Sequence, residues 1–188
     1  MRFAAVLFLL LAIAGSAPAQ SAAQAPAPAP APATISSVLD RQLSGVERLF
    51  TGLVEAMPED KYSFAPVNGE FKGVRNFAEQ VKHVASLNFA VFSAILGEPV
   101  PKAREREAAL KSKADILQYL RDSFALGHRA MGSITEQNVV APIKAPFGNA
   151  MTTRLGLATM VIGHVFDHNG QLVEYLRMNG IIPPASRR

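Results

Sequence analysis

Two histidines near the end of the chain, His164 and His168, stand four residues apart in the stretch GHVFDHNG. An α-helix has about 3.6 residues per turn, so side chains at this spacing lie on one face, one turn apart. Two imidazoles placed in this way can bind one metal ion from adjacent turns. Packing and chance also produce the spacing, so the pair by itself leaves metal binding and ordinary packing open.

A third histidine, His83, lies away from the apolar side of its own segment. That side carries Phe77, Val81 and Val84 at helical spacing, and a histidine buried in a core would be expected among them. We therefore interpret His83 as facing a cleft at one side or end of the fold, opposite His164 and His168. A solvated surface histidine is the alternative.

Together, His83, His164 and His168 form a candidate metal site. Neutral imidazoles bind zinc, nickel and iron, at about 2.0–2.2 Å. The predicted cofactor is therefore a divalent transition metal, with zinc, nickel and iron as the candidates. Three protein ligands leave one coordination position open for water or a substrate, which is compatible with hydrolysis or Lewis-acid activation of a small substrate. The sequence assigns no catalytic residue.

Three other polar residues are candidates for roles near this site. His128 shares the apolar stripe of its segment with Phe124 and Met131, which favours a hydrogen-bonded packing residue over a metal ligand. Asp167 is placed to accept a hydrogen bond from an imidazole N–H, with a solvated acid as the alternative. Tyr175 either lines the same cleft or packs against the core.

Other catalytic patterns are excluded by the residues present. A zinc-protease H-E-x-x-H motif needs a glutamate directly after the first histidine, where this chain has Val165. A ferritin-like di-iron centre needs E-x-x-H motifs and several inward glutamates, and these motifs are missing. The sequence also contains no serine nucleophile motif of the G-x-S-x-G type.

Four segments with helical periodicity must position these residues. They cover about 35–57, 74–96, 112–134 and 152–179. The first helix is predicted to start at Ser36 or Ser37, and Ser37 has Asp40 three residues later, as in a capping box. The third helix is predicted to start at Ser112, which has Asp115 three residues later. Gly97 and Gly180 predict the ends of the second and fourth helices.

The connections 58–73, 97–111 and 135–151 are long and contain Pro or Gly, and none alternates as a strand. Long connections permit a helix to cross over before the next one begins. The predicted fold class is all-α, a four-helix bundle with long connections.

The N-terminal residues predict export. Arg2 precedes an apolar run that ends in Ala17-Pro18-Ala19, as in a secretory signal peptide cleaved near Ala19. The run has about a dozen residues, too short to span roughly 30 Å of hydrocarbon, so no stable membrane insertion is expected after cleavage. Retention as an N-terminal anchor is the alternative. The predicted location is periplasmic or secreted.

These features divide the chain into a signal peptide (1–19), an Ala/Pro-rich linker (20–34), a helical domain (35–184) and a basic tail (185–188). Alternating prolines keep the linker extended and prevent it from joining a core. The pI of about 9.6 arises from Lys and Arg scattered among acids, so we expect no nucleic-acid partner. The chain has no cysteine, so stability must come from the core, with a metal as an additional source.

The stretches FAEQVKHVASLN and GHVFDHNGQLVEYLRMNGIIPP resemble the DinB-like family of metal-binding four-helix bundles, over about 35–184. The resemblance implies up-down-down-up topology. It also implies a divalent metal bound by a histidine of the second helix and an H-x-x-x-H pair of the fourth, here His83, His164 and His168.

The resemblance implies two classes of activity, because some members of this family resemble metal-dependent hydrolases and others are thiol-dependent transferases or isomerases. The predicted function is an exported metalloprotein and candidate hydrolase of small substrates. The alternatives are a non-catalytic metal- or ligand-binding module of the cell envelope, or a thiol-dependent transferase. The expected partner is a small molecule, and a homodimer is left open.

Overall fold

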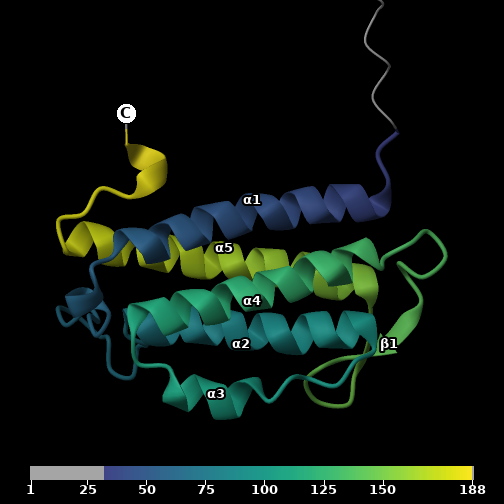
Figure 1. Cartoon of the computed structure of the whole chain (residues 1–188), viewed down its shortest axis with the longest axis horizontal. Coiled ribbons are helices and arrows are strands. Elements are labelled where there is room, and N and C mark those ends of the chain that lie inside the picture. The colour runs from purple at the N-terminus through teal and green to yellow at the C-terminus, as the bar shows by residue number, and fades with distance from the viewer. Residues whose placement is uncertain (1–31, 188) are drawn as a thin grey trace, which may run out of the picture. The chain divides into compact units, whose positions relative to one another are not determined.

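The computed structural model describes residues 32–187, apart from the side chains of residues 103–105. The predicted signal peptide and all but the last residues of the predicted linker lie outside this part. Within it, four long helices form a bundle (Figure 1), namely α1 (Ile35–Ala56), α2 (Phe77–Leu96), α4 (Lys113–Gly132) and α5 (Arg154–Met178). The connections contain η1 (Glu59–Lys61), α3 (Ala103–Ala109), β1 (Pro142–Lys144) and β2 (Met151–Thr153), and η2 (Pro184–Ser186) follows α5.

The two central helices of the sequence, α2 and α4, run parallel. Ser86 contacts Tyr119 at 3.0 Å between the hydroxyl oxygens, and further along both helices Asn88 donates to Ser123 at 3.2 Å. A parallel pair requires the chain to travel back along the bundle between the two helices, and the segment that contains α3 does so (Figure 1).

The first helix runs antiparallel to α4. Arg121, in the first half of α4, donates to Glu55 near the end of α1, whereas His128, further along α4, contacts Asp40 near the start of α1. Figure 1 shows α1 and α5 running in one direction and α2 and α4 in the other. The all-α class and the up-down-down-up order are therefore confirmed.

Most predicted helix boundaries agree with local capping. Ser112 accepts a hydrogen bond from the Asp115 amide at 3.1 Å and begins α4, as predicted. Gly97 and Gly180 follow α2 and α5 in the left-handed conformation, each with φ of 72°, which glycine adopts without a Cβ penalty. The predicted cap of α1 is wrong, because Thr34, not Ser36 or Ser37, is the N-cap.

Two elements in the connections were not predicted. The strands β1 and β2 form an antiparallel hairpin in which Pro142 pairs with Thr153 and Lys144 with Met151. Three residues per strand are too few to display the period-two pattern of a strand. The α3 sequence AREREAA has no apolar stripe, so hydrophobic periodicity could not reveal it.

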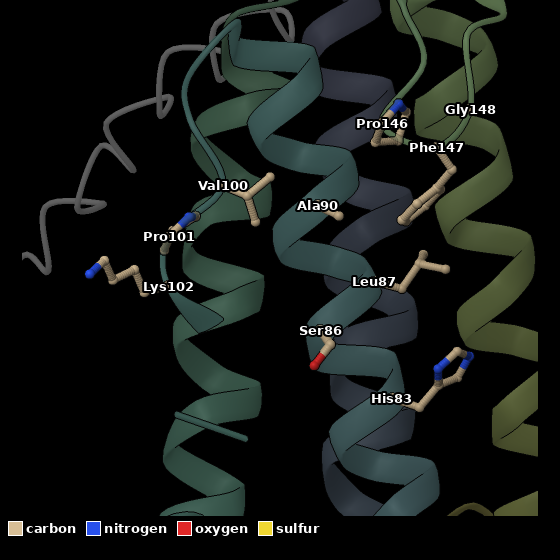
Figure 2. Close-up of a pocket in the computed structure, with 10 residues that line it drawn as sticks. All are labelled: His83, Ser86, Leu87, Ala90, Val100, Pro101, Lys102, Pro146, Phe147 and Gly148. Atoms are coloured by element: carbon tan, nitrogen blue, oxygen red, sulfur yellow. The ribbon is translucent and has the colours of Figure 1, made fainter. Parts of the chain in front are cut away.

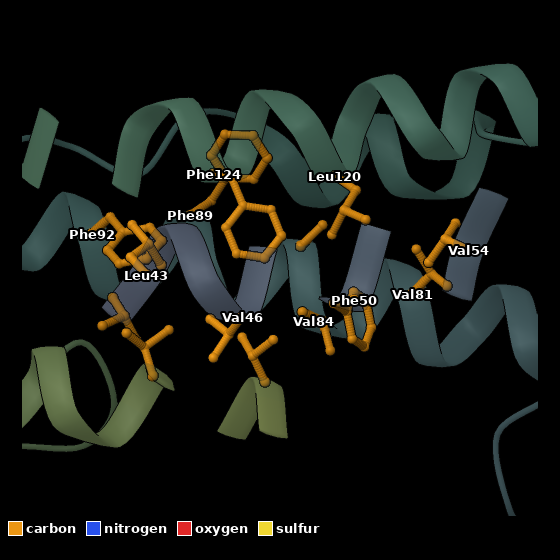
Figure 3. Close-up of a cluster of buried hydrophobic side chains, with 14 of the residues drawn as sticks. Leu43, Val46, Phe50, Val54, Val81, Val84, Phe89, Phe92, Leu120 and Phe124 are labelled. Atoms are coloured by element: carbon orange, nitrogen blue, oxygen red, sulfur yellow. The ribbon is translucent and has the colours of Figure 1, made fainter. Parts of the chain in front are cut away.

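The core is built from the inward stripes of the four long helices (Figure 3). Three of them each contribute a fully buried aromatic side chain, Phe50 from α1, Phe92 from α2 and Phe124 from α4. Gly127 on α4 lies where an added Cβ would stand 2.6 Å from the Phe92 ring and 2.9 Å from Leu43. Glycine therefore permits the close approach of α4 to both neighbours. Among the described residues, no helix has the length and hydropathy to cross a membrane.

Candidate metal centre

The three predicted ligand histidines lie together at the contact between α2 and α5. The Nε2 atom of His164 is 3.2 Å from Nε2 of His83 and 3.1 Å from Nε2 of His168. Nitrogen atoms of all three rings lie within 4.8 Å of one another. His168 is buried and the other two are half-buried. Three imidazoles separated in sequence thus point their nitrogens into one small volume.

Their meeting depends on the antiparallel register of α2 and α5. One turn from His83, Gln80 donates to Gln171 at 2.7 Å, across the same helix contact. At the far end of α2, Arg154 donates from Nε to the Ile95 carbonyl at 3.1 Å. These contacts set the register of α5 along α2, and the register determines which α5 residues face His83.

The environment keeps these histidines neutral. Burial lowers the pKa of His164 to about 4, with the nearby His168 and His83 rings adding to the effect. Burial likewise lowers the pKa of His168 to about 4, with His83 contributing. The pKa of His83 is lowered by burial and by the Arg75 charge, which Glu107 partly opposes. Neutral imidazoles have a free lone pair, so all three are ready to act as ligands at pH 7.

The donor set fits a divalent transition metal. With metal–nitrogen bonds of about 2.1 Å and bond angles between about 90° and 110°, two ligand nitrogens should stand about 3.0–3.4 Å apart. The two Nε2 separations of 3.1 and 3.2 Å lie in that range. The Nδ1 atoms of His164 and His168 are buried and have no hydrogen-bond partner within residues 32–187. Packing, and not hydrogen bonding at Nδ1, therefore orients these two rings.

Neither Asp167 nor Tyr175 hydrogen bonds to the three histidines. Asp167 accepts from Gln171 at 2.9 Å and so supports the glutamine pair that joins α5 to α2. Tyr175 is buried, and its hydroxyl donates to the Arg75 carbonyl at 2.9 Å. Its ring packs edge-on against Phe64. Tyr175 thus anchors the segment that leads into α2.

His128 is not brought to the other three histidines. Its Nδ1 lies 2.6 Å from Asp40 and its Nε2 lies 2.8 Å from Glu47, both on α1. Burial acts to lower the His128 pKa, but hydrogen bonds to the two carboxylates outweigh burial, and the pKa is raised. His128 is therefore a partly buried hydrogen-bonded residue that links α4 to α1.

Two cavities meet at His83. One, of about 610 Å³, lies over α2 between the segment that follows α2 and the loop of the hairpin (Figure 2). The other, of about 450 Å³, is lined by polar side chains that include Arg75, Glu79 and Glu107. His83 and Ser86 line both cavities. The predicted cleft beside His83 is therefore confirmed.

Sequence reasoning did not identify Ser86 and Glu107. Ser86 follows His83 by three residues on α2 and donates to a Glu107 carboxylate oxygen at 2.6 Å. The same serine hydroxyl lies 3.0 Å from the Tyr119 hydroxyl. The i, i+3 spacing from His83 could have indicated Ser86. Glu107 is on α3, and no pattern in the sequence placed that helix over α2.

The chain has relatives of the same fold. The sequence-family model of the DinB superfamily matches residues 42–172 of this chain. A DinB-like protein from Bacillus subtilis has a similar structure, with 18% identity, a TM-score of 0.57, and coverage of 80% of this chain and 99% of that one. A DinB-family protein from Exiguobacterium sibiricum has 17% identity, a TM-score of 0.60 and coverage of 77% and 91%.

A conserved protein from Enterococcus faecalis also has a similar structure, with 17% identity, a TM-score of 0.63 and coverage of 78% of this chain and 98% of that one. At these identities the likeness establishes the fold alone. No curated protein matches the chain.

Proposed function

This chain belongs to the DinB superfamily, and from its histidine geometry we propose that it is a metalloprotein that holds one divalent transition metal through His83, His164 and His168. The observation that carries the proposal is the convergence of three neutral imidazoles, with Nε2 separations of 3.1 and 3.2 Å. Zinc, nickel and iron are the candidate ions, because all three bind imidazole well.

The proposed activity is hydrolysis of a small substrate at this centre. Three protein ligands leave a coordination position for water or a substrate. A bound divalent ion would act there as a Lewis acid. The two cavities beside His83 provide space for such a substrate. Glu107 is the candidate proton acceptor, since its carboxylate lines the polar cavity and Ser86 fixes one of its oxygens.

We also propose that the protein acts outside the cytoplasm, in the periplasm or as a secreted protein. The support is the basic, apolar and small-residue sequence of residues 1–19. N-terminal sequencing of the protein recovered from an expressing cell should begin near Gln20. Protein that starts at Met1 and is recovered with the membrane would contradict this location.

Metal analysis of protein purified without an affinity tag tests the centre. About one equivalent of a single transition metal is expected, with less than about 0.1 equivalent in the His83→Ala and His164→Ala variants. His128→Ala is the matched control, because this histidine is half-buried but bonded to α1, and it should retain the metal. Equal metal content in all four proteins would contradict the site.

The reaction requires a separate test on ester, amide and thiol-conjugation substrates before and after chelation. Turnover of an ester or amide that chelation abolishes supports a hydrolase, and Glu107→Gln should then lower kcat more than it raises KM. Metal binding without turnover of any substrate would instead support a non-catalytic binding module. Metal-dependent conjugation of a thiol would support a transferase.

A further inference from the structure

The larger cavity beside His83 has a mixed lining that includes several apolar side chains, which the metal ligands do not require. Leu87 and Ala90 follow His83 along α2 by four and seven residues, so they continue its face of the helix. Figure 2 shows Phe147 of the hairpin loop close to Leu87, and Val100 on the other side of α2. The cavity therefore extends from His83 along α2, with apolar side chains on both sides.

Two of these side chains are exposed to solvent. Phe147 is 49% exposed and Val100 is 51% exposed, although each borders the cavity. Burying exposed apolar surface lowers the free energy by about 25 cal/mol for each Å². A ligand with an apolar portion therefore gains affinity from this lining.

The two cavities that meet at His83 differ in the polarity of their linings, and this difference favours one orientation of a bound ligand. The smaller one has Arg75, Glu79 and Glu107 in its wall, and an apolar group placed there would cover charged groups. The larger one offers Phe147, Leu87 and Val100. The favourable arrangement puts polar atoms at the histidines and on the Arg75 side, and apolar atoms along α2 toward the hairpin loop.

We propose that the ligand of this protein is a small amphipathic molecule. Its head carries oxygen donors that would reach a metal held by the three histidines, and its alkyl or aryl tail of several carbons lies against Leu87 and Phe147. The cavity of about 610 Å³ is within the range that small-molecule sites occupy. This inference rests on the proposed metal centre and adds the class of molecule that the centre takes.

A series of hydroxamic acids tests the tail separately from the head. Acetohydroxamate carries only the metal-binding group, and butano-, hexano- and octanohydroxamate add carbons to it. Binding to the full-length protein loaded with Zn²⁺ is measured by titration calorimetry. Each added methylene should lower Kd by about twofold to fourfold, the upper value being complete burial at about 0.8 kcal/mol.

In wild type, affinity should rise from acetohydroxamate to octanohydroxamate. The variant Phe147→Ala should reduce this rise in affinity by at least about fivefold, while its Kd for acetohydroxamate stays unchanged. A second variant, Ala90→Glu, places a charge in the same wall and should have a similar effect. Phe166→Ala is the control, since Phe166 is 47% exposed on α5 and outside the lining of this cavity. It should leave the whole series unchanged.

The outcomes separate the two proposals. If acetohydroxamate binds but Kd does not change with chain length, the tail site is wrong and the metal centre stands. A chain-length gain that is the same in wild type, Phe147→Ala and Ala90→Glu also overturns the tail site. If the wild-type protein does not bind Zn²⁺, the metal centre is wrong, and the proposed ligand class is overturned with it.

Discussion

The Nε2 atoms of His83 and His164 lie 3.2 Å apart, although 81 positions separate the two residues in the chain. The first belongs to α2 and the second to α5, so an ion bound by both would join the second bundle helix to the last one. The unfolded chain does not hold these groups together. Metal binding and folding of this domain should therefore be coupled.

Zinc should raise the melting temperature of the metal-free protein. A ligand that binds only the folded state at 100 times its Kd adds about 2.7 kcal/mol to the free energy of unfolding. For a domain of this size, that corresponds to about 5–10 °C. Circular dichroism melts with and without Zn²⁺ measure the shift. His128→Ala should show the same shift and His164→Ala should show none; a full shift in His164→Ala would contradict coupling through the three histidines.

The metal-free protein should lose stability as the pH falls from about 6.5 to about 4. In the folded state the pKa values of His164 and His168 are lowered to about 4, whereas in the unfolded chain they are about 6.5. Between these values the unfolded chain binds more protons, so protonation favours unfolding. Urea midpoints at pH 7 and pH 5 measure the loss.

The variant that replaces both histidines, His164→Ala with His168→Ala, separates this effect from the titration of carboxylates. Carboxylates remain in the variant, so its midpoint should still change with pH, but less than that of the wild type. An equal change in both proteins would show that these two histidines do not titrate as their burial requires.

His128 should have the opposite pH dependence. Its two carboxylate partners raise its folded pKa above the ordinary 6.5, so its stabilising contribution is complete below about 6.5 and is lost as the pH rises through the folded pKa. His128→Gln should therefore cost more stability at pH 6 than at pH 9. The side chain is 34% exposed, so screening limits the difference to about 1 kcal/mol or less. Urea unfolding at both pH values checks it, and a larger cost at pH 9 would contradict it.

Gly127→Ala should destabilise the protein, although alanine is the better helix former. The added Cβ would lie 2.6 Å from Phe92 and 2.9 Å from Leu43, both in the buried core. Overpacking of this kind costs about 1–3 kcal/mol. Gly45→Ala on α1 is the control, because nothing stands within 4 Å of its added Cβ, and it should stabilise by about 0.5–1 kcal/mol. Chemical denaturation of both variants measures the difference, and a stabilised Gly127→Ala would show that Phe92 moves without cost.

Features that depend on neighbouring residues could be predicted from the sequence. The four helices, the Ser112 cap and the glycine ends follow from apolar periodicity and local hydrogen bonding, which act within a few residues. The placement of His164 and His168 on one face follows from helix geometry alone. The position of His83 outside its apolar stripe indicated a cleft, and two cavities lie there.

Features that depend on distant residues required the tertiary structure. The register of α5 along α2, held by Gln80 and Gln171, determines that His83 meets His164, and it results from packing over the whole length of both helices. Glu107 reaches Ser86 only because a polar helix without an apolar stripe crosses back over α2. Local periodicity thus determined which residues could serve as metal ligands, whereas long-range packing decided which of them meet and which surfaces face the space beside them.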